Sequence, residues 1–463
     1  MKKIYMSGWT PRDIFVFLLI INLLQALQVK EAAAWSEHPL LVKPALANHP
    51  VWRYATAVEA VTLKDFLIRT ESELANFLGR QEAWSVTNLP NYKPCPEALM
   101  FRATGNPDDI LERFYSAIRI NPHVKVPLYL HLIPGQESFN RDPADPATIT
   151  TLANPGAMLS SRYVWVRAGE MLDPFEVLCT ANDEPDYGFD LGLFEDNGTA
   201  YGKRYGFGIQ PFGNPNLEYS SQAPFHMGFF HEAGILYKFG PFLRETYIDY
   251  RIFLYKALSE FAFQQGQPYW GWRFMGWGMH YMGDVSMPYH MKPLPGVSTT
   301  RMMWINLKSI LGASRARDNA VQIVSNRHTV FEEFQLQVLR KAYQDSENSH
   351  PFLLALRDSA GNGAFSYDFL INTAALQSAS AAREIDRILK KNVPVRMVSD
   401  PKIEVSDLPE LEKLMELIPG EMGSEANSRV IRAIARQMRS FSMNIRSFMD
   451  SILKNIDPES YSG

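Results

Sequence analysis

The chain is poor in three features that often identify a protein class. Cys95 and Cys179 are the only cysteines in 463 residues, which excludes a disulfide-rich scaffold and leaves either one bridge or two buried thiols. The formal net charge is −4, so nothing indicates a basic nucleic-acid surface, although bound metal ions could supply positive charge locally. The apolar run over residues 14–24 is short for a membrane span, which needs about 20 residues.

Several catalytic motifs are also missing. No Gly-x-Ser-x-Gly sequence provides a nucleophile elbow. Gly206-Phe-Gly208 is followed by no Lys-Ser/Thr pair, so it is not a phosphate-binding loop. His231-Glu232 would need a second histidine at position 235 to form a metalloprotease helix, and that residue is Ile235. These absences argue against the corresponding hydrolases and nucleotide-binding proteins.

The N-terminus has the pattern of a secretory signal. Three basic residues precede or border the apolar run over residues 14–24, and three consecutive alanines end at Ala34. We therefore expect residues 1–34 to be a signal peptide, with an uncleaved anchor as the alternative. Cleavage between Ala34 and Trp35 would make Trp35 the first residue of a secreted or periplasmic protein.

The apolar residues of the remaining chain recur mainly with helical spacing, which predicts a mainly α protein. Thr62-x-x-Asp65 is a capping box at the start of one helix. Short strands are expected within residues 124–133 and 162–167, a Gly-rich surface loop over 183–216, and a polar tether over 399–425. Helices are expected over residues 62–79, 108–120, 241–264, 268–283, 316–343, 367–391 and 427–454.

One stretch concentrates potential metal ligands. His280 and Asp284 are four residues apart, so on a helix they share a face. Pro288 cannot continue that helix, and His290 follows the resulting turn. Imidazole nitrogens and carboxylate oxygens are ligands that suit zinc. His328 and Glu332 repeat the four-residue step, so two helices could hold a metal cluster between them.

The pattern His280-Tyr-x-Gly-Asp284-x-x-x-Pro288-x-His290 resembles the signature of the zinc-dependent phospholipases C of bacteria. The zinc-dependent single-strand nucleases of fungi and plants carry a close variant. The resemblance covers about 110 residues, from His226 to Phe334. It implies a multi-helix phospholipase C/nuclease-like fold over residues 35–463 with three zinc ions in a cleft. Residues 80–225 have no counterpart and are expected to be an inserted, loop-rich subdomain containing the short strands.

The resemblance also implies a set of ligands. His231 is favoured over His226 because it lies 49 residues before His280, and His38 is favoured over His49 as the early histidine. Asp186 resembles a family ligand, but the 44 residues between Asp186 and His231 require an inserted loop. The spacing from His290 to His328 is also longer than usual. The first zinc would take Asp186, His231, His280 and Asp284; the second His290, His328 and Glu332; the third the amine and carbonyl of Trp35, His38 and a bridging Asp284.

The expected function is that of a secreted zinc-dependent phosphodiesterase in which a metal-bound hydroxide attacks phosphorus, with Asp284 and Asp186 as the catalytic carboxylates. A phospholipase C-like activity is the first choice, and a single-strand nuclease the alternative. A zinc-binding cell-envelope protein without activity is a third possibility. The expected partner is a phospholipid or single-stranded nucleic acid. Transient membrane contact could involve the aromatic residues between Tyr269 and Trp277, although at helical spacing such residues more often form core.

Overall fold

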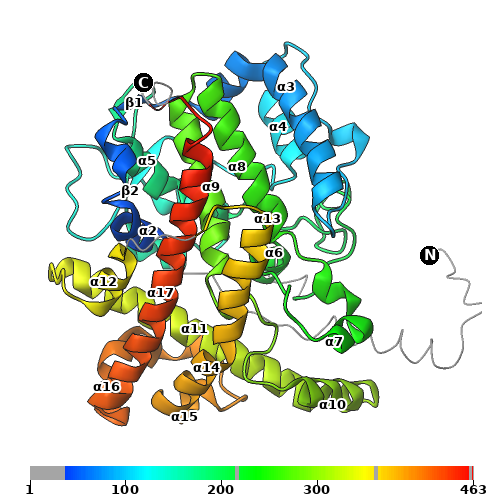
Figure 1. Ribbon diagram of the computed structural model, residues 1–463, viewed down its shortest axis with the longest axis vertical. Coiled ribbons are helices and arrows are strands. Elements are labelled where there is room, and N and C mark those ends of the chain that lie inside the picture. The colour runs from blue at the N-terminus through cyan, green and yellow to red at the C-terminus, as the bar shows by residue number, and fades with distance from the viewer. Residues whose placement is uncertain (1–36, 214–217, 359–362, 458–460, 462–463) are drawn as a thin grey trace, which may run out of the picture.

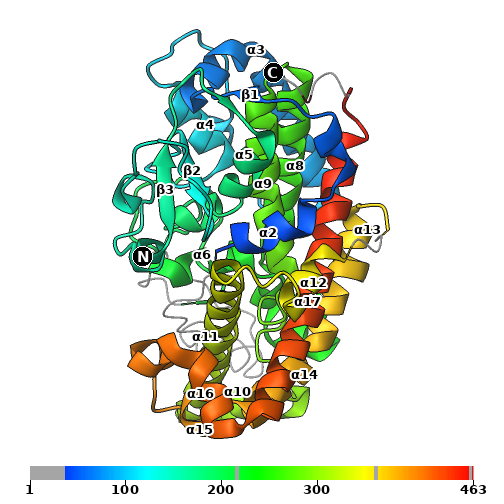
Figure 2. The same cartoon turned by 90° about the vertical axis from the view of Figure 1, so that its left-hand side faces the viewer.

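The computed structural model describes residues 37–213, 218–358, 363–457 and 461 and shows a mainly α fold (Figures 1 and 2). The expected signal peptide and Trp35 lie outside the described residues. Among the described residues, no helix combines the length and apolarity that crossing a membrane requires.

The helical elements alternate with four short strands. In chain order they are α2 Pro39–Leu46, η1 Pro50–Arg53, β1 Val58–Glu59, α3 Leu63–Asn88, η2 Glu97–Leu99, α4 Ile110–Ile118, β2 Tyr129–Leu132, η3 Pro146–Thr148, η4 Gly156–Ser160, β3 Arg162–Trp165, β4 Met171–Leu172, α5 Pro174–Ala181, η5 Glu184–Tyr187, α6 Glu218–His226, α7 Gly234–Phe239, η6 Pro241–Arg244, α8 Ile248–Gln264, α9 Pro268–Val285, α10 Thr299–Ile310, α11 Arg315–Gln344, α12 Pro351–Arg357, α13 Tyr367–Phe369, η7 Leu370–Ala375, α14 Leu376–Asn392, α15 Val395–Val398, η8 Val405–Asp407, η9 Pro409–Lys413, α16 Leu414–Met422 and α17 Ser424–Leu453.

Helix α9 is the centre of the molecule (Figure 2). It packs against α8, α5 and α17, and every residue from Tyr269 to Val285 is buried. A helix that is apolar on all sides is stable only when other elements cover all of it. The aromatic residues of α9 are therefore core, as their helical spacing favoured, and they do not contact lipid.

The glycine of the ligand motif is explained by packing. A Cβ atom at Gly283 would lie 2.7 Å from the ring of Phe441 on α17 and 3.5 Å from the ring of His38. Contacts below about 3 Å cannot be accommodated without displacing a neighbour. Gly283 therefore lets α17 and His38 approach the part of α9 that carries the ligand residues.

The expected strands form two small antiparallel pairs, β2 with β3 and β1 with β4. In the first pair His131 lies opposite Tyr163, and β2 packs on α5, which packs on α9. Apolar residues of the segment 80–225, such as Phe114 and Phe207, belong to the same hydrophobic core as α8, α9 and α17. The segment thus contributes directly to the core around α9.

The expected surface loop over 183–216 is wrong for its first part. Every residue from Asp183 to Phe194 except Asp186 is buried. Burying these acids is tolerable because each has a cationic or hydrogen-bonding partner. Glu184 accepts a 2.6 Å hydrogen bond from Arg273, and Asp190 accepts one of the same length from Arg251.

Some of the expected elements differ from those in the structure. The capping box is confirmed, with Thr62 Oγ1 accepting from the Asp65 amide at 3.1 Å, but α3 continues through Gly79 to Asn88. The helix expected over 367–391 contains the π-helical segment η7. The tether over 399–425 includes α16, which packs on α17. In α16 the helix is supported by burial of Leu414 and Ile418.

Cys95 and Cys179 are both free thiols. Cys179 lies in α5 and is buried, and Cys95 is half-buried. Burial raises the pKa of the Cys95 thiol to about 11, so both cysteines act as small apolar side chains at neutral pH.

Candidate metal centre

Histidine and carboxylate side chains gather beside α9 in three groups. The potential ligand atoms within each group all lie within 4.8 Å of one another. The groups adjoin, since His280 belongs to two of them. We name them the His38 group, consisting of His38, Asp186 and His280; the α9 group, consisting of His226, His280 and Asp284; and the α11 group, consisting of His290, His328 and Glu332.

Asp284 faces two of these groups. Its Oδ2 atom lies 2.9 Å from Nδ1 of His226 and 3.6 Å from Nε2 of His280. Its Oδ1 atom lies 3.6 Å from Nδ1 of His290 in the α11 group. The carboxylate thus stands between the α9 and α11 groups. The ligand set expected from the sequence made Asp284 a bridge to the ion held by Trp35 and His38. In the structure His38 lies with Asp186 and His280.

The α11 group contains the residues expected for the second zinc. Helix α9 ends at Val285, and the following turn carries His290 to α11. His328 Nε2 lies 2.7 Å from Glu332 Oε1, but the geometry is not that of a hydrogen bond, and neither atom has a hydrogen-bond partner among the described residues. Both atoms are therefore available to a cation that contacts the two of them.

The structure favours His38 over His49 as the early histidine. His38 immediately precedes α2 and is fully buried, with its ring 4.2 Å from that of His280. His49 instead caps η1 and lies 3.0 Å from Asp450.

His226, not the expected His231, lies in the cluster. It ends α6, and its Nδ1 atom is 3.3 Å from Nε2 of His280. His231 donates a 2.8 Å hydrogen bond from Nε2 to the carbonyl of Ile371 in η7. The spacing argument failed because the chain beyond α6 turns away to support this π-helical segment.

Backbone carbonyls fix the orientation of two imidazoles. His280 donates from Nδ1 to the carbonyl of Asn182 at 2.8 Å, and His290 donates from Nδ1 to the carbonyl of His226 at 2.9 Å. Each Nε2 atom is thereby left without a proton when the ring is neutral. This is the arrangement in which histidine binds a metal, with the other ring nitrogen held by an outer partner.

Unsatisfied buried atoms test whether a cation fits here. Leaving a buried polar atom without a partner costs about 1–3 kcal/mol, so several in one place indicate a common partner. Among the described residues, the atoms at this site that are buried without a hydrogen-bond partner include His38 Nε2, Asp186 Oδ1, Asp284 Oδ1, His290 Nε2, His328 Nε2 and Glu332 Oε1. This donor set suits zinc and similar divalent ions. These buried groups could hold a metal ion.

The α9 and α11 groups differ in charge state. Burial disfavours charged imidazoles, but the neighbouring carboxylates outweigh it and raise the pKa of His226 to about 10; the pKa of His280 is also raised. In the α11 group burial dominates: it lowers the pKa of His328 to about 3 and that of His290 well below its ordinary value. Burial also raises the pKa of Glu332 well above its usual range.

A network that the sequence did not predict supports His38. His131 lies 3.2 Å from Glu37 through Nε2 and 3.2 Å from Asp183 through Nδ1. Asp183 also accepts a 2.7 Å hydrogen bond from the His38 amide and faces its Nδ1 at 3.2 Å. Arg340 on α11 donates to Glu37 at 2.6 Å. Burial opposes a charged imidazole, but the two carboxylates raise the pKa of His131 to about 9.

These supporting residues were missed because their partners are remote in sequence. His131 has no acid close to it along the chain, yet its partners Glu37 and Asp183 reach it from both directions. One signal was present: Asp183, Glu184, Asp186 and Asp190 fall within eight residues. Such a concentration of acids is more informative once their burial is known, because burial then demands partners.

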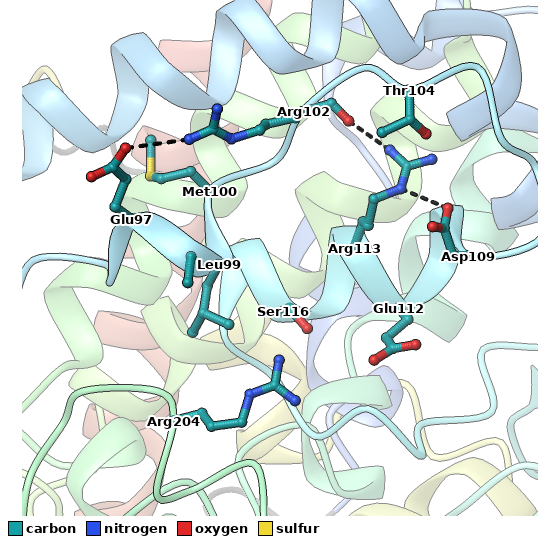
Figure 3. Close-up of a pocket in the computed structure, with 11 residues that line it drawn as sticks. Glu97, Leu99, Met100, Arg102, Thr104, Asp109, Glu112, Arg113, Ser116 and Arg204 are labelled. Carbon is teal, nitrogen blue, oxygen red and sulfur yellow. Dashed lines mark hydrogen bonds and ion pairs between the residues drawn. The ribbon is translucent and has the colours of Figure 1, made fainter.

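Two of the cavities in the described structure bear on the site. One is mostly apolar, is lined by residues such as Met227, Phe229 and Leu294, and reaches His328 of the α11 group. The other is formed by η2, α4 and Arg204 (Figure 3). Two of its arginines pair with acids of the same lining, as Arg113 does with Asp109 at 2.7 Å, and its lining includes none of the three groups.

The geometry beside α9 therefore supplies buried nitrogen and oxygen donors around a shared carboxylate, with their outer contacts in place. Comparisons of the chain with protein-family models, with curated proteins and with solved structures find no match.

Proposed function

We propose that the protein is a zinc-dependent phosphodiesterase of the phospholipase C type that acts outside the cytoplasm. The observation that carries this proposal is the position of Asp284 between the α9 group and the α11 group, each residue of the latter having a buried atom without a hydrogen-bond partner among the described residues. Enzymes that displace a phosphate ester often use several metal ions held close together by shared carboxylates. The resemblance of the motif around His280 to zinc-dependent phospholipases C supports the same assignment.

The residues divide into three sets of ligands. The α11 group would hold one zinc. The α9 and His38 groups share His280, whose Nε2 atom can bind a single ion, so His280 would serve one of these two groups. The other group would rely on its remaining residues, with Trp35 completing the His38 group. Bound zinc supplies Lewis acidity, which withdraws charge from a phosphoryl oxygen and makes water acidic enough to attack at neutral pH.

The protein's own groups hold this set in place and direct the substrate. The carbonyls of Asn182 and His226 orient two ligand imidazoles. Asp190, held by Arg251, faces Nε2 of His226 at 3.4 Å and stabilises a proton there. The Asp186 side chain is 14% exposed while that of Asp284 is fully buried. We therefore expect substrate to approach from the Asp186 side.

The cavity beside the α11 group has mainly aliphatic and aromatic walls, with Phe212, Met227 and Val321 among them. Its volume is only about 30 Å³, close to that of one water molecule, so it holds neither a lipid chain nor a nucleotide. The preference for a lipid over a nucleotide substrate rests on the resemblance of the motif around His280.

The test compares two substrates with one preparation. The purified full chain is assayed on phosphatidylcholine and on single-stranded DNA, before and after chelation and zinc addition, while elemental analysis gives the zinc content. We expect zinc-dependent release of phosphocholine and two to three zinc ions per chain.

A matched pair of variants completes this test. His290→Ala should lose zinc and activity, whereas His123→Ala, at an exposed histidine, should keep both. Cleavage of DNA alone would replace the lipase assignment with a nuclease. Zinc content below one per chain, or zinc without turnover of either substrate, would contradict the proposed enzyme.

A further inference from the structure

Residues 285–317 are unusually basic for this protein. They contain five lysines and arginines and no acid, although the whole chain has 50 acids and 46 basic residues. The segment includes α10, which lies at the lower end of the molecule in both views (Figures 1 and 2). The local charge is thus opposite in sign to that of the whole protein.

The solvent face of α10 alternates basic and apolar side chains. Arg301, Trp304, Lys308 and Leu311 follow one another at steps of three or four residues, so they lie along one face of the helix. Trp304 is 57% exposed and Leu311, just past the end of α10, is 70% exposed. Lys308 Nζ lies 5.2 Å from the centre of the Trp304 ring.

The opposite face of α10 is buried, and the helix packs on α11. Met302 is buried and belongs to the same small hydrophobic cluster as Leu236 of α7. Helix α7 in turn exposes Ile235 and Phe239 on its outer side, with 39% and 36% of their surface accessible, and carries Lys238 between them. We call the exposed residues of these two helices the α7–α10 surface: Ile235, Lys238, Phe239, Arg301, Trp304, Lys308 and Leu311.

Buried apolar side chains lie behind this surface. The cluster that contains Leu236 and Met302 also contains Met227 and Phe229, and these two residues line the small cavity that reaches His328 of the α11 group. The surface therefore rests on the same apolar cluster that adjoins the candidate metal centre.

We propose that the α7–α10 surface docks the protein on an anionic lipid bilayer. A helix with an exposed tryptophan and lysines on the same face lies in the plane of a membrane interface, where the ring enters the headgroup layer and the lysines reach the phosphates. Anionic lipid attracts each cation near the surface. A purely electrostatic partner such as a nucleic acid would gain nothing from exposed Leu311 and Phe239. The docking surface deepens the proposed lipase function but is tested separately from it.

The experiment measures partition of the full chain onto vesicles by sedimentation. One vesicle preparation contains equimolar phosphatidylcholine and phosphatidylglycerol, and the other contains phosphatidylcholine alone. All proteins carry the same N-terminal segment, so its contribution cancels between variants. We expect wild-type protein to bind the anionic vesicles more tightly, and binding to weaken as salt is raised.

Two pairs of variants separate the apolar and electrostatic contributions. Trp304→Ser should weaken partition about tenfold because an apolar ring no longer leaves water, whereas Phe139→Ser should not. Phe139 is a close match, since it is 66% exposed and has Arg141 5.8 Å from its ring. Lys308→Glu should weaken binding to anionic vesicles by at least about fivefold per unit charge, whereas Lys64→Glu, an equal charge change at an exposed site of α3, should have little effect.

Any other partner of the α7–α10 surface would give a result distinct from that of a membrane. Binding of labelled single-stranded DNA that Lys308→Glu abolishes and Trp304→Ser preserves, without vesicle binding, would overturn the proposal in favour of a nucleic acid. Dimerisation of the wild type that Trp304→Ser removes would assign the surface to a second copy. Absence of vesicle binding overturns the proposal whatever the enzyme does, and vesicle binding without lipid hydrolysis preserves the docking surface while contradicting the lipase.

Discussion

The α9 and α11 groups use the same kinds of side chain in opposite electrostatic settings. Around the α9 group, Asp186, Asp190 and Asp284 raise the pKa of His226, so protons already balance part of the negative charge. Around the α11 group, burial keeps His290 and His328 neutral and raises the pKa of Glu332.

The difference shows that ligand identity alone does not define a metal site. A cation entering the α9 group would replace imidazole protons that the carboxylates stabilise, whereas one entering the α11 group would meet imidazoles that are already deprotonated. Nearby carboxylates produce the raised pKa in the α9 group, and burial produces the lowered pKa in the α11 group. Asp284, which faces both groups, couples them.

The largest effect on activity is expected from replacing Asp284, the carboxylate that faces both groups. Asp284→Asn should lower phosphodiester hydrolysis by more than about a hundredfold, because losing a ligand should cost more than losing an outer partner of a ligand, which costs about tenfold to a hundredfold. The amide cannot carry the negative charge that both groups face. Initial rates on phosphatidylcholine, with zinc content measured in parallel, check this. A variant that kept a tenth of the wild-type rate with full zinc would lose only about 1.4 kcal/mol of barrier stabilisation, too little for a shared ligand.

Single substitutions should separate the two groups. His328→Ala and His226→Ala should each reduce the zinc content by about one ion, because each removes a ligand from a different group. Elemental analysis after gel filtration measures the loss, and the double variant should lose more than either alone. His231→Ala is the matched control: it should keep its zinc and lower stability by about 1 kcal/mol through the lost hydrogen bond to Ile371. Zinc loss in His231→Ala with none in His226→Ala would reverse the assignment.

Substitution of Asp183, which supports His38 from outside the three groups, should have a smaller effect on zinc binding. Asp183→Asn should weaken zinc binding at the His38 group by about tenfold to a hundredfold, since the carboxylate faces His38 Nδ1 and accepts from its amide. Competition with a zinc chelator measures the affinity without relying on turnover. Asp173→Asn, which changes a carboxylate that caps α5, should leave zinc affinity unchanged. Equal affinities in wild type and Asp183→Asn would show that Asp183 only packs against His38.

Asp249 provides a reference for a carboxylate buried away from the three groups. Burial raises its pKa from 3.8 to about 6, so the folded protein holds this proton more tightly than the unfolded chain does. Its cost to stability is absent below the unfolded pKa and complete above about pH 6. The stability that Asp249→Asn gains over wild type should therefore increase by about 1 kcal/mol when the pH is raised from 5 to 8. Urea unfolding at both pH values tests this, and a difference that shrinks as pH rises would contradict it.

The local sequence pattern was sufficient to predict the potential ligands that lie within one or two helical turns of each other. The spacing of His280, Asp284 and His290 predicted a shared helix face followed by a turn, and α9 ends at Val285 as that pattern requires. His328 and Glu332 meet for the same reason, because α11 is continuous through both. Spacing failed for His231, since segments of irregular backbone separate it from α9 and the chain folds back differently from a simple count of residues.

The sequence by itself predicted the mainly α fold, favoured burial of the aromatic residues of α9 and paired two sets of potential ligands, because helical periodicity acts over a few residues. Only the tertiary structure decided that His226 joins these ligands, that Asp183 and His131 support His38, and that α10 presents a basic and apolar surface. These features depend on burial and on partners far apart in the chain, and neither is visible until the elements pack together.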